Sequence, residues 1–380
     1  MQHDTMRQQF EKKAQIELQF NWIFVLIVGV VILTFFLTLI GGQSKTTDQS
    51  IAINLAQRMK TILSASEQQP GTIKIYDRIP PLDITFTCDA KEDFYNYFIE
   101  GTDEVDTKYN LFFSPRNLDS NVLYTWTESW KVPYDVANFL YLSNDKQQYI
   151  FYNGSELTDM TDLYEEFPEN FSRKMWNEDE LDEDINMDSY TYVFFKRQLP
   201  QNPSEALDLA FVNTNVGTLG KVIIIEPENS AEPFALGTLH FFRLGSPGIK
   251  GATNTFKLHN LLTTGHSTSA YLGKASIYGA IFSENKVLYE CTMNKAMQRL
   301  QILTLLQYYR IQEVVPYAST NCAYLLNNPL TGAATKISDI NKTAAQPFSV
   351  TTTADLRTYL DELDKSNKQL ATLGNCPAIY

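Results

Sequence analysis

An uninterrupted apolar segment from Trp22 to Ile40, WIFVLIVGVVILTFFLTLI, constrains this chain more than any other part of its sequence. It contains no charged residue and no proline. A helix of nineteen residues covers roughly 28 Å, close to the ~30 Å thickness of a bilayer's hydrocarbon core. A buried core helix would be shorter and would carry more polar residues. The segment therefore predicts one transmembrane helix, with Trp22 as an interface anchor and Ile40 at the other end.

The predicted span divides the chain into four parts. We expect a cytoplasmic tail over residues 1–21, the membrane helix over 22–40, an amphipathic stalk over 41–69 and a large domain over 70–380. Basic residues are nearly balanced across the span, so they do not orient it. All four cysteines follow the span, as do three glycosylation-type sequons at Asn153, Asn170 and Asn341. Both features favour a cell-membrane protein whose large domain is extracytoplasmic.

The residues directly before the span carry a second signal. Lys12-Lys13 is followed by Ala14, Gln15 and Glu17, and then by the apolar helix. This junction, about 30 residues long, resembles the archaeal class III signal peptide of type IV pilin-like proteins. The resemblance implies cleavage between Ala14 and Gln15. It does not imply filament formation, because Gln19 stands where pilins have the glutamate that helps subunits assemble, and Glu17 stands where they have serine. More loosely, the whole chain resembles single-pass membrane proteins of small-genome archaea, a likeness that implies no activity.

The stalk predicted after the span is an amphipathic helix over Ser44–Gln69, ended by Pro70-Gly71. Its apolar residues recur at helical spacing: Ile51, Leu55, Met59, Ile62 and Leu63. They would pack on the large domain or form a coiled-coil seam. The stripe is barely two heptads long, which favours packing on the domain.

Acidic residues are concentrated between residues 156 and 188. Thirteen acids and two basic residues there account for −11 of the net charge of −13. The acidic balance excludes a nucleic-acid partner, which would require a basic face. Asp182, Asp184, Asn186 and Asp188 alternate like calcium ligands, but the EF-hand glycine and glutamate are missing. We therefore expect an acidic loop, with calcium binding as the alternative, and expect deletion of residues 177–188 to leave folding intact.

Short aromatic and β-branched segments after Thr72 predict a mixed β-sheet. The predicted strands are Thr72–Tyr76, Asp83–Cys88, Leu111–Ser114, Val122–Trp130, Phe139–Leu142, Gln148–Tyr152, Tyr190–Lys196, Lys221–Glu226, Gly237–Arg243 and Ala275–Ser283. Three of them are apolar throughout, which predicts central strands covered on both faces. Tyr124, Trp126 and Trp130 share one face of their strand. That face is interpreted as core packing, with a carbohydrate- or peptide-binding platform as the alternative.

The C-terminal third, residues 285–380, is predicted to be helical. Asn285–Val314 has an apolar side that includes Met293, Leu300 and Leu306, and Ala354–Leu373 has leucines at helical spacing with Thr353 as N-cap. A helix is also expected within Met160–Arg173, interrupted at Pro168. The fold class is therefore α+β, a mixed sheet covered by C-terminal helices.

Motifs for catalysis, cofactors and metals are absent from the sequence. It has no G-x-S-x-G, no H-E-x-x-H, no G-x-G-x-x-G and no C-x-x-C pair. One loop brings His259, His266, Ser267 and Ser269 close in sequence. It is interpreted as a polar surface loop, with a histidine-assisted serine as the alternative. We expect no cofactor and no metal, and expect that the protein is not an enzyme.

The four cysteines allow three pairings. Cys291 and Cys322 flank a long predicted helix, so they meet only if the chain folds back beside it. Cys376 follows the last predicted helix, whose end would approach the strand that carries Cys88. We predict the pairs Cys88–Cys376 and Cys291–Cys322.

These observations favour a non-catalytic cell-surface protein anchored in the lipid bilayer, a pilin-like or envelope subunit that assembles with itself or with other envelope proteins. The first alternative is a membrane-tethered module that binds a glycan or a protein. The second is an ectoenzyme of the hydrolase type, acting through Ser267 or Ser269.

Overall fold

The computed structural model describes residues 24–38, 52–64, 69–77, 79, 82–89, 94–99, 105–106, 110–153, 157–176, 189–199, 219–244, 266–373 and 376–380. The chain divides into two compact units, Met1–Leu55 and Ala56–Tyr380. The candidate processing site at Ala14 and Gln15, the ends of the apolar segment at Trp22 and Ile40, and His259 lie outside the described residues.

In the first unit, residues 24–38 of the apolar segment are helical, and every described side chain of this helix is exposed. The two threonines do not interrupt it, because their hydroxyls donate back to carbonyls in the preceding turn. Across the described parts of the chain, no helix is both long enough and apolar enough to cross a membrane.

The described part of the stalk is helical over residues 52–64, and the second unit begins within this helix, at Ala56. Met59, Ile62 and Leu63 are buried, as the amphipathic pattern predicts. The Tyr97 hydroxyl donates to the backbone oxygen of Ala56 at 3.1 Å. This part of the helix therefore packs on the domain.

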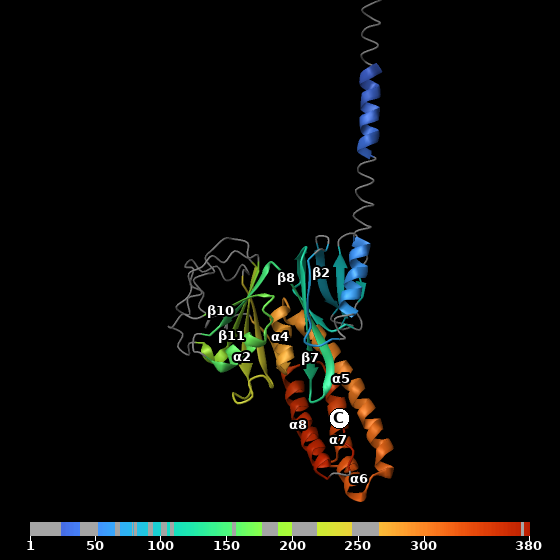
Figure 1. The fold of residues 1–380 in the computed structure, drawn as a ribbon, viewed down its shortest axis with the longest axis vertical. Helices are drawn as coiled ribbons and strands as arrows, with labels where there is room; N and C mark the ends of the chain where they lie inside the picture. The colour runs from blue at the N-terminus through green and yellow to red at the C-terminus, as the bar shows by residue number, and fades with distance from the viewer. Residues whose placement is uncertain are drawn as a thin grey trace, which may run out of the picture. The chain divides into compact units, whose positions relative to one another are not determined.

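The described strands of the second unit form three sheets (Figure 1). The first has the order β1 (Ile73–Tyr76), β7 (Leu123–Lys131), β8 (Asp135–Asn144), β5 (Phe112–Phe113). The second has the order β4 (Val105–Asp106), β3 (Phe94–Ile99), β2 (Leu82–Asp89), β6 (Asn117–Ser120). The third has the order β10 (Ser172–Trp176), β9 (Gln147–Tyr152), β11 (Ser189–Phe195), β12 (Leu219–Pro227), β13 (Leu236–Leu244), β14 (Ser267–Leu272). Nine of the predicted strands are confirmed, and the structure adds β3, β4, β6, β10 and β14.

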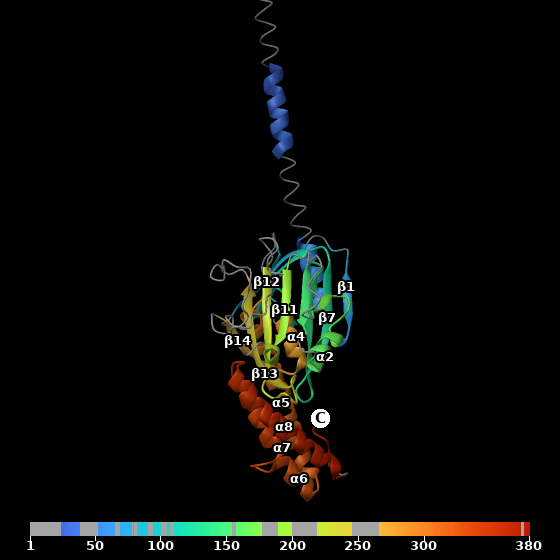
Figure 2. The same ribbon diagram turned by 90° about the vertical axis from the view of Figure 1, so that its left-hand side faces the viewer.

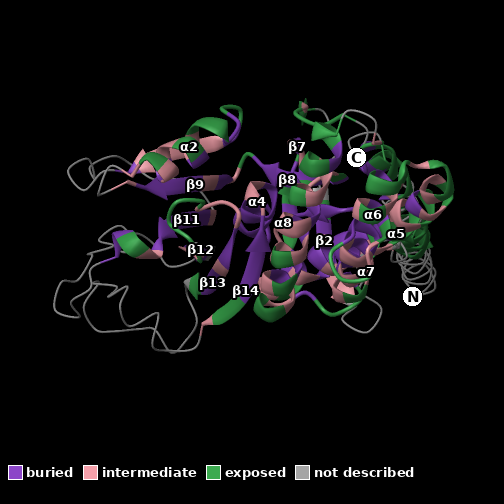
Figure 3. Ribbon diagram, turned by 90° about the horizontal axis from the view of Figure 1, so that it is seen from below, coloured by how far each residue is buried: buried purple, intermediate pink, exposed green. Residues whose placement is uncertain are grey.

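The six-stranded sheet is mixed, as predicted. Strands β10, β9, β11 and β12 run parallel, whereas β13 and β14 are antiparallel to their neighbours. Its central strands are buried on both faces: Ile223 and Ile225 belong to the main core, while Val222 and Ile224 belong to a second cluster on the opposite face. Figure 3 shows these strands as almost continuously buried.

Helix α4 (Lys274–Phe282) lies between the first sheet and the six-stranded sheet. Every residue after Lys274 is buried. The hydroxyl of Tyr141 in β8 donates to the backbone oxygen of Ala275 at 2.7 Å, and Tyr278 donates to Leu163 at 3.1 Å. The prediction of a strand over Ala275–Ser283 is therefore wrong. A helix covered on every side has no polar face, so its apolar sequence has no helical period.

The remaining helices follow the predicted pattern only in part. Helix α2 (Thr158–Glu166) precedes β10, and a short 3-10 turn, η1 (Lys196–Gln198), follows β11. The C-terminal third contains α5 (Lys286–Val314), η3 (Val315–Tyr317), α6 (Thr320–Asn327), α7 (Ala333–Ala344) and α8 (Val350–Thr372). Helix α7 packs between α5 and α8 at one end of the domain (Figure 2). Helix α8 starts earlier than predicted, because the Ser349 side chain, not Thr353, caps it.

All four cysteines form disulfides, but the predicted pairs are wrong. The structure joins Cys88 to Cys291 and Cys322 to Cys376, with Cα–Cα distances of 6.3 and 5.5 Å. The start of α5 packs on β2 and β3, which brings Cys291 to Cys88. The 29 residues of α5 then carry the chain about 44 Å away. Helix α8 ends beside α6, so Cys376 meets Cys322 there.

Candidate functional site

Among the described residues of the loop considered from sequence as a histidine-assisted serine, His266 and Ser269 do not come together. Ser269 is buried and its Oγ donates to Glu290 in α5 at 2.7 Å. The His266 ring instead stacks on Phe242, with centroids 5.4 Å apart. Phe242 and Leu239, which pairs with Ser269, face opposite sides of β13. His266 and Ser269 therefore lie on opposite sides of the sheet.

A polar cluster that the sequence did not reveal lies on the same face as His266. Glu226 of β12 accepts hydrogen bonds from Lys196 Nζ at 2.6 Å and from His240 Nε2 at 2.9 Å. The His240 and His266 rings lie 5.2 Å apart. Pairing of β12 with β13 brings Glu226 and His240 side by side, whereas Lys196 comes from η1, which follows β11. The spacing of these three residues in the sequence therefore could not predict the cluster.

The charges of this cluster follow from burial and hydrogen bonding. Burial raises the pKa of Glu226, but the hydrogen bonds from Lys196 and His240 outweigh it, so the carboxyl pKa lies below its ordinary value. Burial lowers the pKa of His240, although Glu226 opposes this. At neutral pH, Glu226 is therefore an anion and His240 is neutral. The His240 Nδ1 atom is buried and receives no hydrogen bond from any described residue, so it does not reach a substrate in this conformation.

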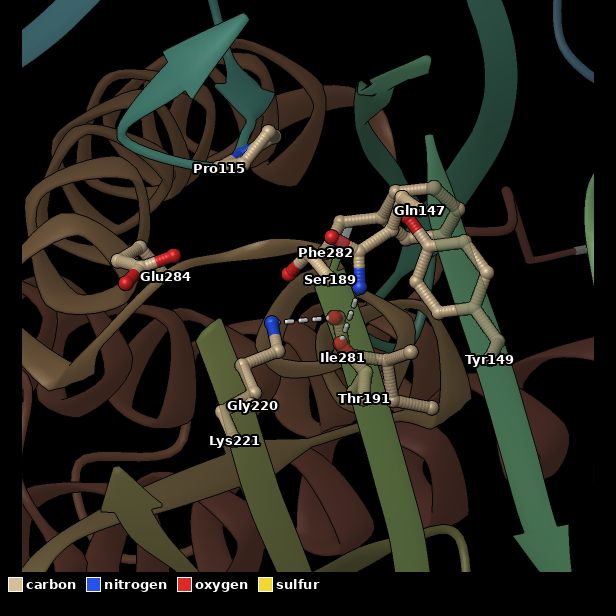
Figure 4. A pocket seen from close by; sticks show the side chains of 10 residues that line it. All are labelled: Pro115, Gln147, Tyr149, Ser189, Thr191, Gly220, Lys221, Ile281, Phe282 and Glu284. Carbon is tan, nitrogen blue, oxygen red and sulfur yellow. Dashed lines mark hydrogen bonds between the residues drawn. The ribbon is translucent and has the colours of Figure 1, made fainter. Parts of the chain in front are cut away.

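A second polar site surrounds Lys221 of β12 (Figure 4). Its Nζ donates to the backbone oxygens of Ile281 and Ser283, both at 2.5 Å, and to that of Ala280 at 3.4 Å. These carbonyls end α4, where the helix has no further N–H groups to bind them. Desolvation by burial lowers the pKa of Lys221 to about 7, although the Glu284 carboxylate opposes this.

The cavity beside Lys221 decides what this lysine can do. Gln147 and Thr191 line it, joined by a 2.9 Å hydrogen bond from Gln147 Nε2 to Thr191 Oγ1. Its volume of about 10 Å³ holds roughly one water molecule. A lysine with a lowered pKa can act as a nucleophile. Here no substrate fits, and the donors already bind carbonyls. Lys221 therefore caps α4, and the arrangement is structural.

The aromatic face formed by Tyr124, Trp126 and Trp130 is part of the core. Trp126 and Trp130 are buried, and Trp126 packs edge-on against Tyr278 of α4 with centroids 4.7 Å apart. The indole N–H of Trp130 donates to the backbone oxygen of Leu272 at 2.7 Å. These rings hold the first sheet against α4 and β14, so they are not a carbohydrate platform.

An exposed apolar stripe runs along the second half of α5. Ile302, Leu305, Leu306 and Tyr309 are spaced as one helical face and are between 45% and 61% exposed. The sequence pattern placed Leu306 on the buried side with Leu300, but the second half of α5 is covered only on the side of Thr304 and Ile311, which are buried. Contiguous exposed apolar side chains of this kind mark surfaces that contact other proteins.

Comparison with family models, with curated proteins and with solved structures finds no match to this chain. Among the residues whose positions are described, no group of histidine, cysteine, aspartate and glutamate side chains could hold a metal ion. The alternating acids of the predicted calcium loop lie outside these residues.

Proposed function

We propose that this protein is a membrane-anchored cell-surface protein whose domain lies outside the cytoplasm and contacts other envelope proteins. The observation that carries the proposal is the helix over residues 24–38, whose apolar side chains are all exposed. Exposure of such a helix to water would be costly, at about 25 cal/mol per Å² of apolar surface. The apolar segment that contains this helix, residues 22–40, has the length and composition of a bilayer span.

The two disulfides support the extracytoplasmic placement of the domain. They join distant elements, β2 to α5 and α6 to the segment after α8. Disulfides of this structural kind persist in oxidising compartments and are rare in the cytosol. The positions of all four cysteines after the apolar segment agree with one membrane crossing before the domain.

We further propose that the N-terminus is processed between Ala14 and Gln15, as in pilin-like proteins. Processing would leave the apolar helix at the mature N-terminus and so favour lateral contacts between anchored proteins. The α5 stripe supports a role in protein contacts. Among binding modules, it favours a protein ligand over a glycan, because Trp126 and Trp130 on the aromatic face of β7 are buried.

Reporter fusions test the proposal. Reporters placed after residue 15 and after residue 70 should lie on opposite sides of the membrane, with the second outside the cytoplasm. A cytoplasmic signal from the second reporter would overturn the proposal. Mass spectrometry of the mature N-terminus checks processing: Gln15 as the first residue supports the pilin-like route, whereas Met1 or Gln2 contradicts it.

A further inference from the structure

The turn between α2 and β10 holds Asn170 at the surface. The backbone N–H of Phe171 donates to the backbone oxygen of Pro168 at 3.3 Å, which closes the turn. Asn170 is exposed, and no described residue forms a hydrogen bond with its side chain. Asn170-Phe171-Ser172 is one of the three sequons.

Buried groups on both sides fix this turn. Phe167 and Phe171 are buried in the main core, where their rings lie 5.7 Å apart. The Arg173 guanidinium donates to the backbone oxygens of Tyr164 and Phe167 at the end of α2. A large group on Asn170 would therefore extend into solvent without disturbing the contacts that hold the turn.

The sequon at Asn341 is placed differently, in the last turn of α7. Its Nδ2 donates to the backbone oxygen of Gln301 at 2.7 Å and to Thr304 Oγ1 at 3.1 Å, both in α5. A glycan would replace one of these two N–H donors and would place a bulky group between the helices. At Asn153 the asparagine is half-buried and the other two sequon residues lie outside the described part, so that sequon carries no inference.

We propose that Asn170 is an N-glycosylation acceptor and that Asn341 is not. This proposal rests on the extracytoplasmic placement proposed above. The donor is a lipid-phosphate-linked oligosaccharide. Asn170 Nδ2 forms a bond to the anomeric carbon of the sugar, the bond from that carbon to the phosphate oxygen breaks, and the lipid phosphate leaves with the electron pair. The Nδ2 proton passes to a base, and nothing is oxidised or reduced.

The glycan would also cover an exposed sheet edge. Ser172 is the first residue of β10, which is the outermost described strand of the six-stranded sheet on that side. Unpaired edge strands invite pairing with other chains. A hydrophilic glycan on Asn170, two residues before the start of β10, would hinder pairing of another chain with this edge.

The test uses the full-length chain expressed in a host that N-glycosylates exported proteins, with site-resolved mass spectrometry of its glycopeptides. Asn170 should carry a glycan, and Asn170→Gln should abolish that glycoform. Asn341 should be unmodified in the folded protein. As a matched control, Ala231→Thr creates a sequon at Asn229, which lies in an exposed turn. The Asn229 side-chain oxygen accepts a hydrogen bond from the Ala231 N–H, and its Nδ2 is left for the glycan.

The outcomes separate this proposal from the one it rests on. An unmodified Asn170 together with a glycosylated Asn229 in the Ala231→Thr variant overturns the acceptor site but keeps the extracytoplasmic placement. If neither asparagine is modified, both proposals are overturned. A glycan on Asn341 in protein with unchanged thermal stability also overturns the proposal, because it shows that the α5–α7 hydrogen bonds do not protect that sequon.

Discussion

Lys221 places a buried amine against the carbonyl oxygens that end α4, and the pH dependence of stability should report it. Its pKa is about 7 in the folded protein and about 10.4 in an unfolded chain. Between these values the unfolded state binds the additional proton, so the free energy of unfolding rises with pH, by at most about 1.4 kcal/mol per pH unit. As pH falls through this window, that stability is lost.

Urea unfolding of the compact unit Ala56–Tyr380 between about pH 7.5 and 9.5 measures this rise. The upper limit avoids unfolded tyrosines, which ionise near pH 10. Lys221→Met should remove most of the slope, whereas Lys368→Met, which changes an exposed lysine in α8, should keep it. An equal slope in wild type and Lys221→Met would contradict the assignment.

Gly279 is required where α4 meets Phe113. A Cβ at this position would lie 2.6–2.8 Å from three ring carbons of Phe113. The ring cannot yield easily, because Phe139 and Tyr141 pack against it. Gly279→Ala should therefore lower the free energy of unfolding by up to about 2 kcal/mol, since the cost of overpacking (about 1–3 kcal/mol) exceeds the gain in helix propensity (about 1 kcal/mol). In a Phe113→Leu background the same change should be neutral or stabilising, and urea unfolding of the four proteins checks the cycle.

At the scale of helices and strands, the sequence predicts the elements that have a regular hydrophobic period or clear boundary residues. β11 and β12 are recognisable as buried strands, and α5 and α8 as long helices. α4 is not, because burial on all sides removes the polar residues that define a helical face. β10, SRKMW, has no alternation because it lies at the sheet edge. The Lys221 cap could not be predicted either, since it requires α4 to be a helix that ends beside β12.

The disulfides should contribute unequally, because they close loops of different length. Cys88 and Cys291 are 203 residues apart, and Cys322 and Cys376 are 54 apart. In the chain-entropy model the longer loop stabilises by about 1 kcal/mol more. Replacing both Cys88 and Cys291 by serine should therefore reduce the free energy of unfolding more than replacing Cys322 and Cys376. Non-reducing peptide mapping must first confirm the pairs, and the reverse order of stabilities would argue against the loop-entropy explanation.

At the scale of the whole domain, the order of β10, β9 and β11 sets how long the connection over residues 177–188 must be. Charge and composition do not reveal this requirement. The acidic residues 177–188 connect β10 to β11, and both strands run parallel to β9, which lies between them. Trp176 pairs with Tyr152 at one end of β9, whereas Ser189 pairs with Gln147 at the other. Trp176 and Ser189 are therefore about 19 Å apart, from the strand rise and spacing.

This connection reverses the expectation that residues 177–188 can be deleted. Joining Trp176 directly to Ser189 spans only about 3.8 Å between Cα atoms, so the deletion should prevent β10 and β11 from both pairing with β9. We expect the deletion variant of Ala56–Tyr380 to lose its cooperative thermal transition. A variant of equal length, with the seven acids of this segment replaced by asparagine and glutamine, should keep it, because the connection needs length and not charge. Circular dichroism melting compares the two. A folded deletion variant would show that neither the length nor the charge of this segment is needed, and an unfolded variant of equal length would show that its charge is needed.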